Sequence, residues 1–197
     1  MLMDKEGKIT ICVLALIFMG IIVYHIDNQR RMLKTIIDKH EQKLDIILED
    51  YKKVNIYYDS LLNIVDSLPL GSPLDTLEVS SNYGWRRSPL RSGWQMHAGI
   101  DYMAIWSDTV YATGSGVVKK THWMGGYGRC IVIDHAWGYQ SRYAHLYKYF
   151  VSKGDTVKKG QPIARAGNSG AVTGPHLHYE IRRDGKTADP SLFVLDN

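Results

Sequence analysis

Cysteine is scarce in this sequence. Cys12 and Cys130 are the two cysteines among 197 residues, too few for a disulfide framework or a zinc site built from thiolates. The net charge is also small, +4 from 24 Lys and Arg against 20 Asp and Glu. With 45% hydrophobic and 22% charged residues, the chain is neither disordered nor collagen-like. Its length admits one ordinary domain with additional segments, or two small domains.

The basic residues are unevenly distributed along the chain. Up to Leu74 there are 9 basic and 10 acidic residues, and after Leu74 there are 15 basic and 10 acidic residues. The first part therefore carries −1 and the second part +5, which indicates two parts of different kinds. The sequence has no nucleic-acid recognition motif, so we do not interpret the positive charge as a site for DNA or RNA.

Residues 9–26, ITICVLALIFMGIIVYHI, contain no Lys, Arg, Asp or Glu. They are apolar on every face and just long enough to span a bilayer, which predicts a transmembrane helix rather than an amphipathic surface helix. The alternative is a cleaved signal peptide, but no small-residue cleavage site follows, so we expect an uncleaved signal anchor. The positive-inside rule does not fix the orientation, because basic residues flank both ends: Lys5 and Lys8 before, and Arg30, Arg31 and Lys34 after.

The next segment has apolar and aromatic residues at alternating spacings of four and three. They are Leu33, Ile37, His40, Leu44, Ile47, Tyr51, Val54, Tyr58, Leu61, Val65 and Leu68. This 3.5-residue period predicts a coiled-coil helix over residues 27–68. We interpret His40 as a register-setting residue or a defect in the apolar seam, not as a ligand. Self-association, an envelope protein partner and packing onto the rest of the chain all stay open. Proline and glycine then predict a linker at residues 69–74.

From residue 75 onward, short β-rich runs alternate with glycine-rich breaks. The predicted strands are Val110–Ala112, Val117–Thr121, Cys130–Asp134, Gln140–Ala144, Ile163–Ala166 and Leu177–Arg182. No run in this part has a helical period, so residues 75–197 are predicted to form an all-β domain with its own core. We expect Cys130 to be a buried strand residue without a disulfide partner.

Four histidines and an aspartate of this domain form a candidate site. His97 and Asp101 lie in MHAGIDY, and His176 and His178 lie in GPHLHYEI. In extended chain, an even spacing places the members of each pair on one face. Two imidazoles and a carboxylate provide three zinc ligands and leave a fourth position for water. His145, in RYAHLY, is a further candidate, and spacing alone does not decide between His176 and His178.

Other residues near these motifs receive less specific predictions. His122 and His135 flank glycine-rich turns, and we expect them to be surface or turn residues. The sequence lacks H-E-x-x-H, so Glu180 is interpreted as a strand residue outside the ligand set, not as a catalytic base. Four aromatic residues flank the first motif and either line a substrate cleft or belong to the core: Tyr83, Trp85, Trp94 and Tyr102.

The motifs MHAGIDY, SRYAHL and TGPHLHYEI, in this order, resemble the lysostaphin-type (LytM-like) zinc endopeptidases, which cleave peptidoglycan peptides. The resemblance extends over residues 79–194 and includes SSNYGWRRSP, GYGRCIVIDH and VSKGDTVKKGQPIARAGNSG. It implies an antiparallel all-β fold, with one zinc ion held by His97, Asp101 and His178. It further implies that His145 and His176 are catalytic, one accepting a proton and the other stabilising the oxyanion or protonating the leaving amine. Which histidine has which role stays open.

The resemblance also implies where the protein works. A hydrolase of peptidoglycan stem-peptide cross-links acts outside the cytoplasm, so we expect residues 1–8 inside and the β domain on the periplasmic or cell-wall side of the cytoplasmic membrane. The +5 charge of that domain suits a carboxylate-rich wall polymer. All five site positions carry the residue types of the family, whereas degenerate members of the family lack metal ligands. Thr is common in the family at the position of Ser141, and this difference affects no catalytic residue. The alternative is a non-catalytic envelope scaffold or activator, in which the β domain binds wall peptides and the coiled coil recruits partners.

Overall fold

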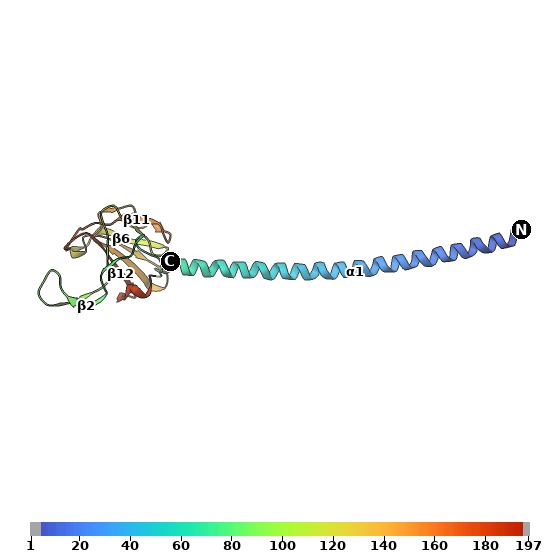
Figure 1. Cartoon of the computed structure of the whole chain (residues 1–197), viewed down its shortest axis with the longest axis horizontal. Coiled ribbons are helices and arrows are strands. Elements are labelled where there is room, and N and C mark those ends of the chain that lie inside the picture. The colour runs from blue at the N-terminus through green and yellow to red at the C-terminus, as the bar shows by residue number, and fades with distance from the viewer. Residues whose placement is uncertain (1–4, 195–197) are drawn as a thin grey trace. The chain divides into compact units, whose positions relative to one another are not determined.

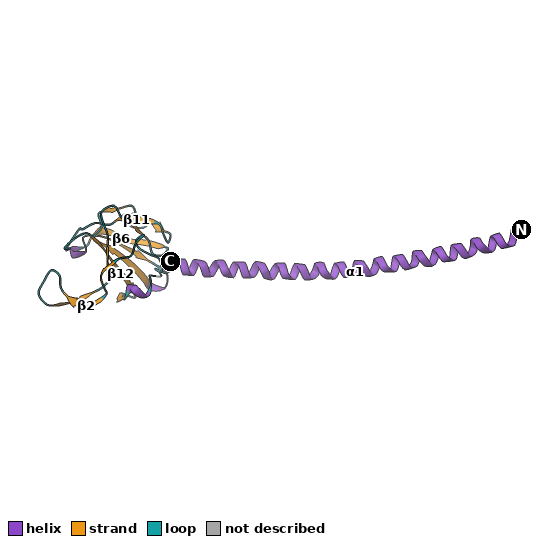
Figure 2. Cartoon of the chain, in the orientation of Figure 1, coloured by secondary structure: helices purple, strands orange, loops and turns teal. Residues whose placement is uncertain are grey.

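The computed structural model describes residues 5–194, so the outer ends of the predicted terminal segments, 1–4 and 195–197, lie outside the described residues. The chain divides into two compact units, one reaching to Tyr58 and the other beginning at Asp59. The regular structure consists of one long helix and a domain of strands, loops and the short 3-10 helices Gly125–Tyr127, Ala136–Gly138 and Pro190–Leu192 (Figures 1 and 2). The predicted combination of an N-terminal helix and an antiparallel all-β domain is confirmed.

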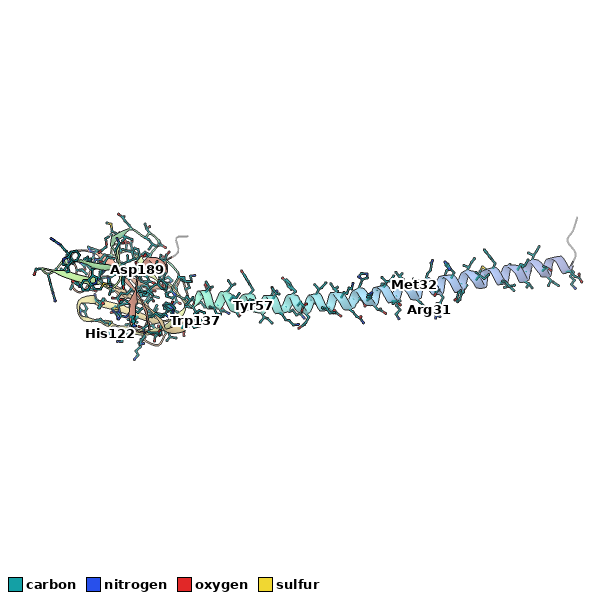
Figure 3. All side chains as sticks on the ribbon, turned by 90° about the horizontal axis from the view of Figure 1, so that it is seen from below. Arg31, Met32, Tyr57, His122, Trp137 and Asp189 are labelled. Carbon is teal, nitrogen blue, oxygen red and sulfur yellow. The ribbon has the colours of Figure 1, made fainter. Side chains whose placement is uncertain are left out.

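Helix α1 (Lys5–Asp66) is continuous for 62 residues through both the predicted membrane segment and the predicted coiled-coil segment. Its apolar side chains are exposed along residues 9–26, Leu16 to 72%. Among the described residues, α1 is the one helix long and apolar enough to cross a membrane. Arg31, Met32 and Tyr57 likewise project from the helix (Figure 3). The coiled coil stays a prediction.

The helix ends two residues before the predicted limit. Leu68 precedes Pro69, and a residue before proline is disfavoured in the helical region. The segment that follows is part of the second unit and is hydrogen-bonded to its strands and loops. Gly71 N donates to Thr113 O at 2.7 Å, and Tyr111 N donates to Pro73 O at 3.0 Å. Residues 69–74 are therefore held by the β domain through their backbone.

The strands of the β domain pair antiparallel in three sheets. The largest sheet has the order β1-β4-β12-β8-β7-β6-β10, with β13 also paired to β12; β5-β11-β9 and β2-β3 form the others. The bounds are β1 (Val79–Ser81), β2 (Gly84–Arg87), β3 (Trp94–His97), β4 (Ile100–Met103), β5 (Thr109–Tyr111), β6 (Gly116–Trp123), β7 (Arg129–Asp134), β8 (Tyr139–Ala144), β9 (Lys148–Tyr149), β10 (Thr156–Val157), β11 (Pro162–Arg165), β12 (His176–Arg183) and β13 (Lys186–Ala188). The six predicted runs correspond to β5, β6, β7, β8, β11 and β12.

Strand β12 connects the core to the candidate site. Leu177, Tyr179 and Ile181 are fully buried in the main hydrophobic core. Because side chains alternate along a strand, His178 and Glu180 face the opposite side of the sheet, where they are also buried. The strand is thus held from both faces, which fixes the position of His178.

Cys130 lies on β7 and is fully buried, as predicted. It packs with Val132 and Ala144 in a second, smaller hydrophobic cluster. Burial raises the pKa of the Cys130 thiol to about 12. The thiol is therefore protonated at neutral pH and behaves as a small apolar side chain.

Candidate metal centre

Strand register brings the first two candidate ligands together. His178 on β12 lies directly opposite Asp101 on β4. His97 ends β3, and Gly99 carries the chain from His97 into β4. A Cβ atom at Gly99 would lie 2.2 Å from Tyr179 O, so a residue with a side chain does not fit there. The glycine between the two motif residues therefore permits the close backbone approach that places His97 beside Asp101.

Three side-chain atoms meet in the buried site: His97 Nε2, Asp101 Oδ1 and His178 Nδ1. His178 Nδ1 lies 2.7 Å from Asp101 Oδ1 and 3.1 Å from His97 Nε2. His97 Nε2 lies 3.1 Å from Asp101 Oδ1. Within residues 5–194, this is the one group of three or more His, Cys, Asp or Glu side chains close enough to hold a metal ion.

The second nitrogen of each imidazole determines its tautomer. His97 Nδ1 lies 2.7 Å from the carbonyl oxygen of Asn82, and His178 Nε2 lies 3.2 Å from Glu180 Oε1. Carbonyl and carboxylate oxygens accept hydrogen bonds, so these two nitrogens donate. In neutral rings the lone pairs are then on His97 Nε2 and His178 Nδ1, facing Asp101. Three atoms with lone pairs at such separations repel one another unless a cation binds between them, so the donor set fits a metal ion.

Asp101 is ionised in this arrangement. Burial alone would raise its pKa, but when His178 and His97 are protonated toward it, their hydrogen bonds and positive charge outweigh that effect and hold the pKa well below its usual range. Its other oxygen, Oδ2, accepts a hydrogen bond of 3.2 Å from Arg86 Nη2. The carboxylate is therefore oriented from both sides.

The Glu180 carboxylate contacts Nε2 of His178, the ring nitrogen that faces away from Asp101. The buried carboxylate accepts hydrogen bonds from Tyr127 Oη at 2.6 Å, Arg142 Nη1 at 2.9 Å and Arg182 Nη1 at 3.0 Å. Burial would raise the pKa of Glu180, but the hydrogen bond with His178 and the charge of Arg142 lower it to about 2. An ionised carboxylate on the far nitrogen of a ligating histidine fixes the ring orientation and increases its basicity.

His145 and His176 lie beside this cluster with their rings 4.7 Å apart. His145 Nδ1 lies 2.8 Å from Ser169 O, and His176 Nδ1 lies 2.9 Å from Gly174 O. Because carbonyl oxygens accept, both Nδ1 atoms donate, which leaves Nε2 of each neutral ring free to accept a proton. His176 Nε2 lies 3.8 Å from Asp101 Oδ1.

The backbone of His145 is strained, with φ at 61° in the left-handed region. Its N–H donates to Tyr127 O at 2.9 Å, which helps to hold this turn at the end of β8. Strained residues are found preferentially at functional sites. Burial, followed by the neighbouring histidines, lowers the pKa of His145 to about 4, so its ring is neutral at neutral pH.

All five predicted site residues line one open cleft of about 550 Å³. The other predictions near it have mixed outcomes. Tyr102 belongs to the core and Tyr83 packs against it, whereas Trp85 and Trp94 are about 70% exposed and line neither the core nor this cleft.

The two remaining histidines of the domain differ from each other. His122 is exposed on β6 (Figure 3), as predicted. His135 precedes the turn at Ala136–Gly138 and is half-buried. Its Nδ1 lies 2.9 Å from Ser115 O and its Nε2 lies 2.7 Å from Ser141 Oγ. His135 is thus a structural residue, and Ser141 is its hydrogen-bond partner.

Sequence reasoning missed the residues that orient the ligands. Glu180 follows His178 by two positions, so strand alternation could have placed both on one face. Arg86 lies in the conspicuous run SSNYGWRRSP, but its contact with Asp101 depends on how the β2–β3 hairpin packs. The contribution of Asn82 comes from its backbone carbonyl, which carries no signal in the side-chain pattern.

Comparisons with known proteins agree with this geometry. Residues 95–190 match the model of peptidase family M23. The chain is 40% identical over 123 residues to the DD-carboxypeptidase/endopeptidase Mpg of Neisseria meningitidis, covering 62% of this chain and 28% of that protein. It is 39% identical over 140 residues to the peptidoglycan DD-endopeptidase ShyC of Vibrio cholerae, covering 71% and 32%. The chain thus spans about a third or less of the length of these curated relatives.

Solved structures give the same match. The catalytic domain of the antimicrobial peptidase lysostaphin from Staphylococcus simulans is similar with a TM-score of 0.54 and 32% identity, covering 59% of this chain and 91% of that one. A zinc-containing peptidase from Vibrio cholerae is similar with a TM-score of 0.56 and 37% identity, covering 59% and 37%. The family match at residues 95–190 lies within the β domain.

Proposed function

The chain carries a domain of peptidase family M23, of the LytM/lysostaphin type, and on this premise we propose that it is a zinc metalloendopeptidase that hydrolyses peptide bonds in peptidoglycan cross-links. The observation that carries the proposal is the convergence of three lone-pair atoms from His97, Asp101 and His178 in a cleft that also contains His145 and His176. The name of the relative ShyC, a peptidoglycan DD-endopeptidase, supports peptidoglycan as the substrate.

His97, Asp101 and His178 would hold the zinc ion, one per domain. Two imidazole nitrogens and a carboxylate oxygen are a donor set of catalytic zinc sites, which keep a further position open. When bound, zinc supplies Lewis acidity that polarises a carbonyl group and makes water more acidic. The contacts of His97 with Asn82 and of His178 with Glu180 would keep both ligands in the required tautomer.

His145 and His176 would handle the protons of the reaction. Each ring donates through Nδ1 to a backbone carbonyl, so the neutral ring can accept a proton at Nε2, and the protonated ring can return it to the leaving amine. A protonated ring can also stabilise a developing oxyanion. Their rings pack against each other, which lets the two histidines act on the same bound peptide from neighbouring positions.

The N-terminal part would attach the domain to the cytoplasmic membrane. We assign residues 1–8 to the cytoplasm, 9–26 to a single-pass anchor, 27–68 to a coiled-coil helix, 69–74 to a linker and 75–197 to the zinc endopeptidase domain outside the cytoplasm. The exposed apolar side chains of residues 9–26 in α1 support the anchor. Peptidoglycan lies outside the membrane, which supports this orientation.

Two variants test the proposed roles. His178→Ala is expected to lose bound zinc, whereas His145→Ala should keep zinc and lose activity by about a hundred-fold or more, because it removes a proton-transfer group without removing a ligand. Zinc per chain is measured by elemental analysis and activity on a purified cross-linked muropeptide. His122→Ala, at an exposed position of the same domain, is the control and should keep both. Equal zinc loss in His145→Ala and His178→Ala would contradict the assignment of roles.

A further inference from the structure

The end of strand β8 carries one residue more than its pairing with β7 requires. Ile131 lies opposite Tyr143 in the regular register, and continuing that register would place Arg129 opposite His145. Instead, Leu146 N donates to Arg129 O at 3.0 Å, so the pairing has shifted by one residue and His145 is the extra one. An extra residue of this kind redirects a side chain and interrupts the ladder of backbone hydrogen bonds.

The hydroxyl of Ser169 completes the interrupted ladder. Arg129 N donates to Ser169 Oγ at 2.9 Å, and Ser169 Oγ donates to Leu146 O at 2.8 Å. Two residues paired across an antiparallel ladder exchange two backbone hydrogen bonds. Arg129 and Leu146 form one of these bonds directly, and the hydroxyl takes the place of the other, because it both donates and accepts. The Ser169 side chain is therefore fixed to the ends of both strands.

The backbone of the same serine holds the ring of His145. Ser169 O accepts a hydrogen bond of 2.8 Å from His145 Nδ1, and Ser169 N donates to His145 O at 3.4 Å. Because the hydroxyl fixes Ser169 to β7 and to the end of β8, the carbonyl that accepts from the ring has a fixed position and direction. This contact leaves Nε2 as the ring nitrogen that accepts a proton in the proposed reaction.

The loop that carries Ser169 packs closely against neighbouring backbone. A Cβ atom at Gly128, whose φ is 62°, would lie 2.4 Å from Ser169 C and O. From the same loop, Gly167 O accepts a hydrogen bond of 3.1 Å from His176 N. The loop therefore contacts the backbone of His176 as well as the ring of His145, and a shift of Ser169 would move one histidine relative to the other.

We propose that Ser169 is a positioning residue for the hydrolysis: by bridging Arg129 and Leu146, its hydroxyl holds the carbonyl that orients the His145 ring. Ser169 is neither one of the three grouped ligands nor part of the cleft lining, so it acts through His145. Rates depend steeply on such placement, since a misplacement of about 1 Å can lower a rate by about a hundred-fold. This inference rests on the proposed function and adds a residue to it.

The first test separates turnover from binding in the zinc-loaded, detergent-solubilised full chain. For Ser169→Ala, which removes the bridge, we expect kcat on a cross-linked muropeptide to fall by about 10- to 100-fold while KM changes by less than about two-fold. Zinc per chain should stay at the wild-type level. Ser169→Thr keeps the hydroxyl and should restore most of the lost kcat. Ser152→Ala, the same change at an exposed position outside the cleft lining, is the matched control and should behave like the wild type.

The second test reads the His145 ring directly and does not depend on turnover. With isotope-labelled histidine in the full chain, nuclear magnetic resonance distinguishes a ring protonated at Nδ1 from one protonated at Nε2. The signals that disappear in His145→Gln identify the ring. We expect the Nδ1–H form to dominate in the wild type, in Ser152→Ala and in Ser169→Thr, and a mixture of both forms in Ser169→Ala.

The two tests fail separately. An unchanged His145 ring in Ser169→Ala, a loss of zinc that parallels the loss of kcat, or a Ser169→Thr protein as impaired as Ser169→Ala would overturn the inference. Turnover by the wild type together with any of these results would leave the proposed function intact. A wild type that cleaves no peptide, but whose ring tautomer depends on Ser169, would contradict the proposed function and support the positioning role.

Discussion

At the scale of single residues, the chemistry of the site depends on which ring nitrogen carries the proton. Four histidines line the cleft, and each has one nitrogen held by an oxygen acceptor: a backbone carbonyl for His97, His145 and His176, and the Glu180 carboxylate for His178. In the neutral rings the opposite nitrogens therefore carry lone pairs: those of His97 and His178 contact Asp101, and those of His145 and His176 can accept a proton. The acceptors are as important to the proposed reaction as the histidines themselves.

The carboxylate of Glu180 provides the most direct test of this orientation. Glu180→Gln keeps the shape of the side chain but removes the charge that faces His178 Nε2, so we expect zinc affinity to fall by roughly 10- to 100-fold. Competition with a chelator of known affinity measures the change. Glu78→Gln, at an exposed position of the same domain, is the control. A Glu180→Gln affinity equal to that of the control would show that the charge does not support the ligand.

His135 predicts a pH dependence of stability that is independent of the metal site. Burial lowers its pKa, outweighing the opposite effects of the Ser115 carbonyl and of Asp134. Below about pH 6.5 the unfolded chain therefore binds a proton that the folded domain does not, and the free energy of unfolding falls as the pH falls. Denaturant unfolding between about pH 8 and about pH 5 should show a larger loss for the wild type than for His135→Gln. Parallel curves for the two proteins would contradict this explanation.

Sequence could predict which residue types meet at the site but not their separations. The even spacing of His176 and His178 predicts a shared face, and both indeed approach Asp101. Their distances to Asp101 Oδ1, 3.8 and 2.7 Å, differ because His178 is directly opposite Asp101 whereas His176 is opposite Met103. Cross-strand register is a long-range property, so the local pattern does not contain it.

At the scale of elements, the predicted strands all have buried residues, although β4 was missed despite its burial. β7, β8 and β12 carry alternating or continuous runs of β-branched and aromatic residues, which is the pattern of strands packed on a core. β2 and β3 were missed because they are four residues long, mostly exposed and separated from the large sheet. This hairpin nevertheless supplies His97 and Arg86, which contacts Asp101. The β2–β3 hairpin is therefore part of the candidate site although its sequence predicts strands only weakly.

Gly99 offers a test of how β4 and β12 position the ligands. A Cβ atom there would overlap the backbone of Tyr179, which is fixed by the core, so Gly99→Ala must shift β4 and with it Asp101. We expect a loss of about 3 kcal/mol or more in the free energy of unfolding, together with weaker zinc binding. Chemical denaturation and zinc titration measure the two effects.

Gly174→Ala is the matched control for this substitution, because no atom lies within 4 Å of its added Cβ and its backbone needs no positive φ. It should behave like the wild type in both measurements. If Gly99→Ala had the stability of Gly174→Ala, the close approach of β4 to β12 would not be needed for the fold.

At the scale of the whole molecule, the chain joins a helix with an exposed apolar segment to a domain that carries the excess positive charge. The composition alone shows the change in net charge at Leu74, from −1 before it to +5 after it, and the sequence also shows the apolar run at residues 9–26. The sequence did not predict that α1 continues unbroken to Asp66, because the membrane segment and the 3.5-residue period give separate signals. Whether the helix pairs with another copy depends on a partner chain, which a single sequence pattern does not specify.

Membrane orientation is tested by a reporter enzyme fused after Asn197. Because the proposed substrate lies outside the cytoplasm, the reporter should be active there and the β domain should be digested by protease added to spheroplasts. A fusion to residue 8 should show the opposite behaviour. Reporter activity confined to the cytoplasm would contradict the proposed location of the hydrolase.

Digestion of purified peptidoglycan by the detergent-solubilised full chain shows whether the protein is a zinc-dependent peptidoglycan endopeptidase. Mass spectrometry of the soluble products measures new amino ends and the loss of cross-linked dimers. We predict that both changes occur with the zinc-loaded protein, stop when a chelator removes the metal, and return when zinc is restored. A folded, zinc-loaded protein that produces no new amino ends would contradict the proposed endopeptidase function.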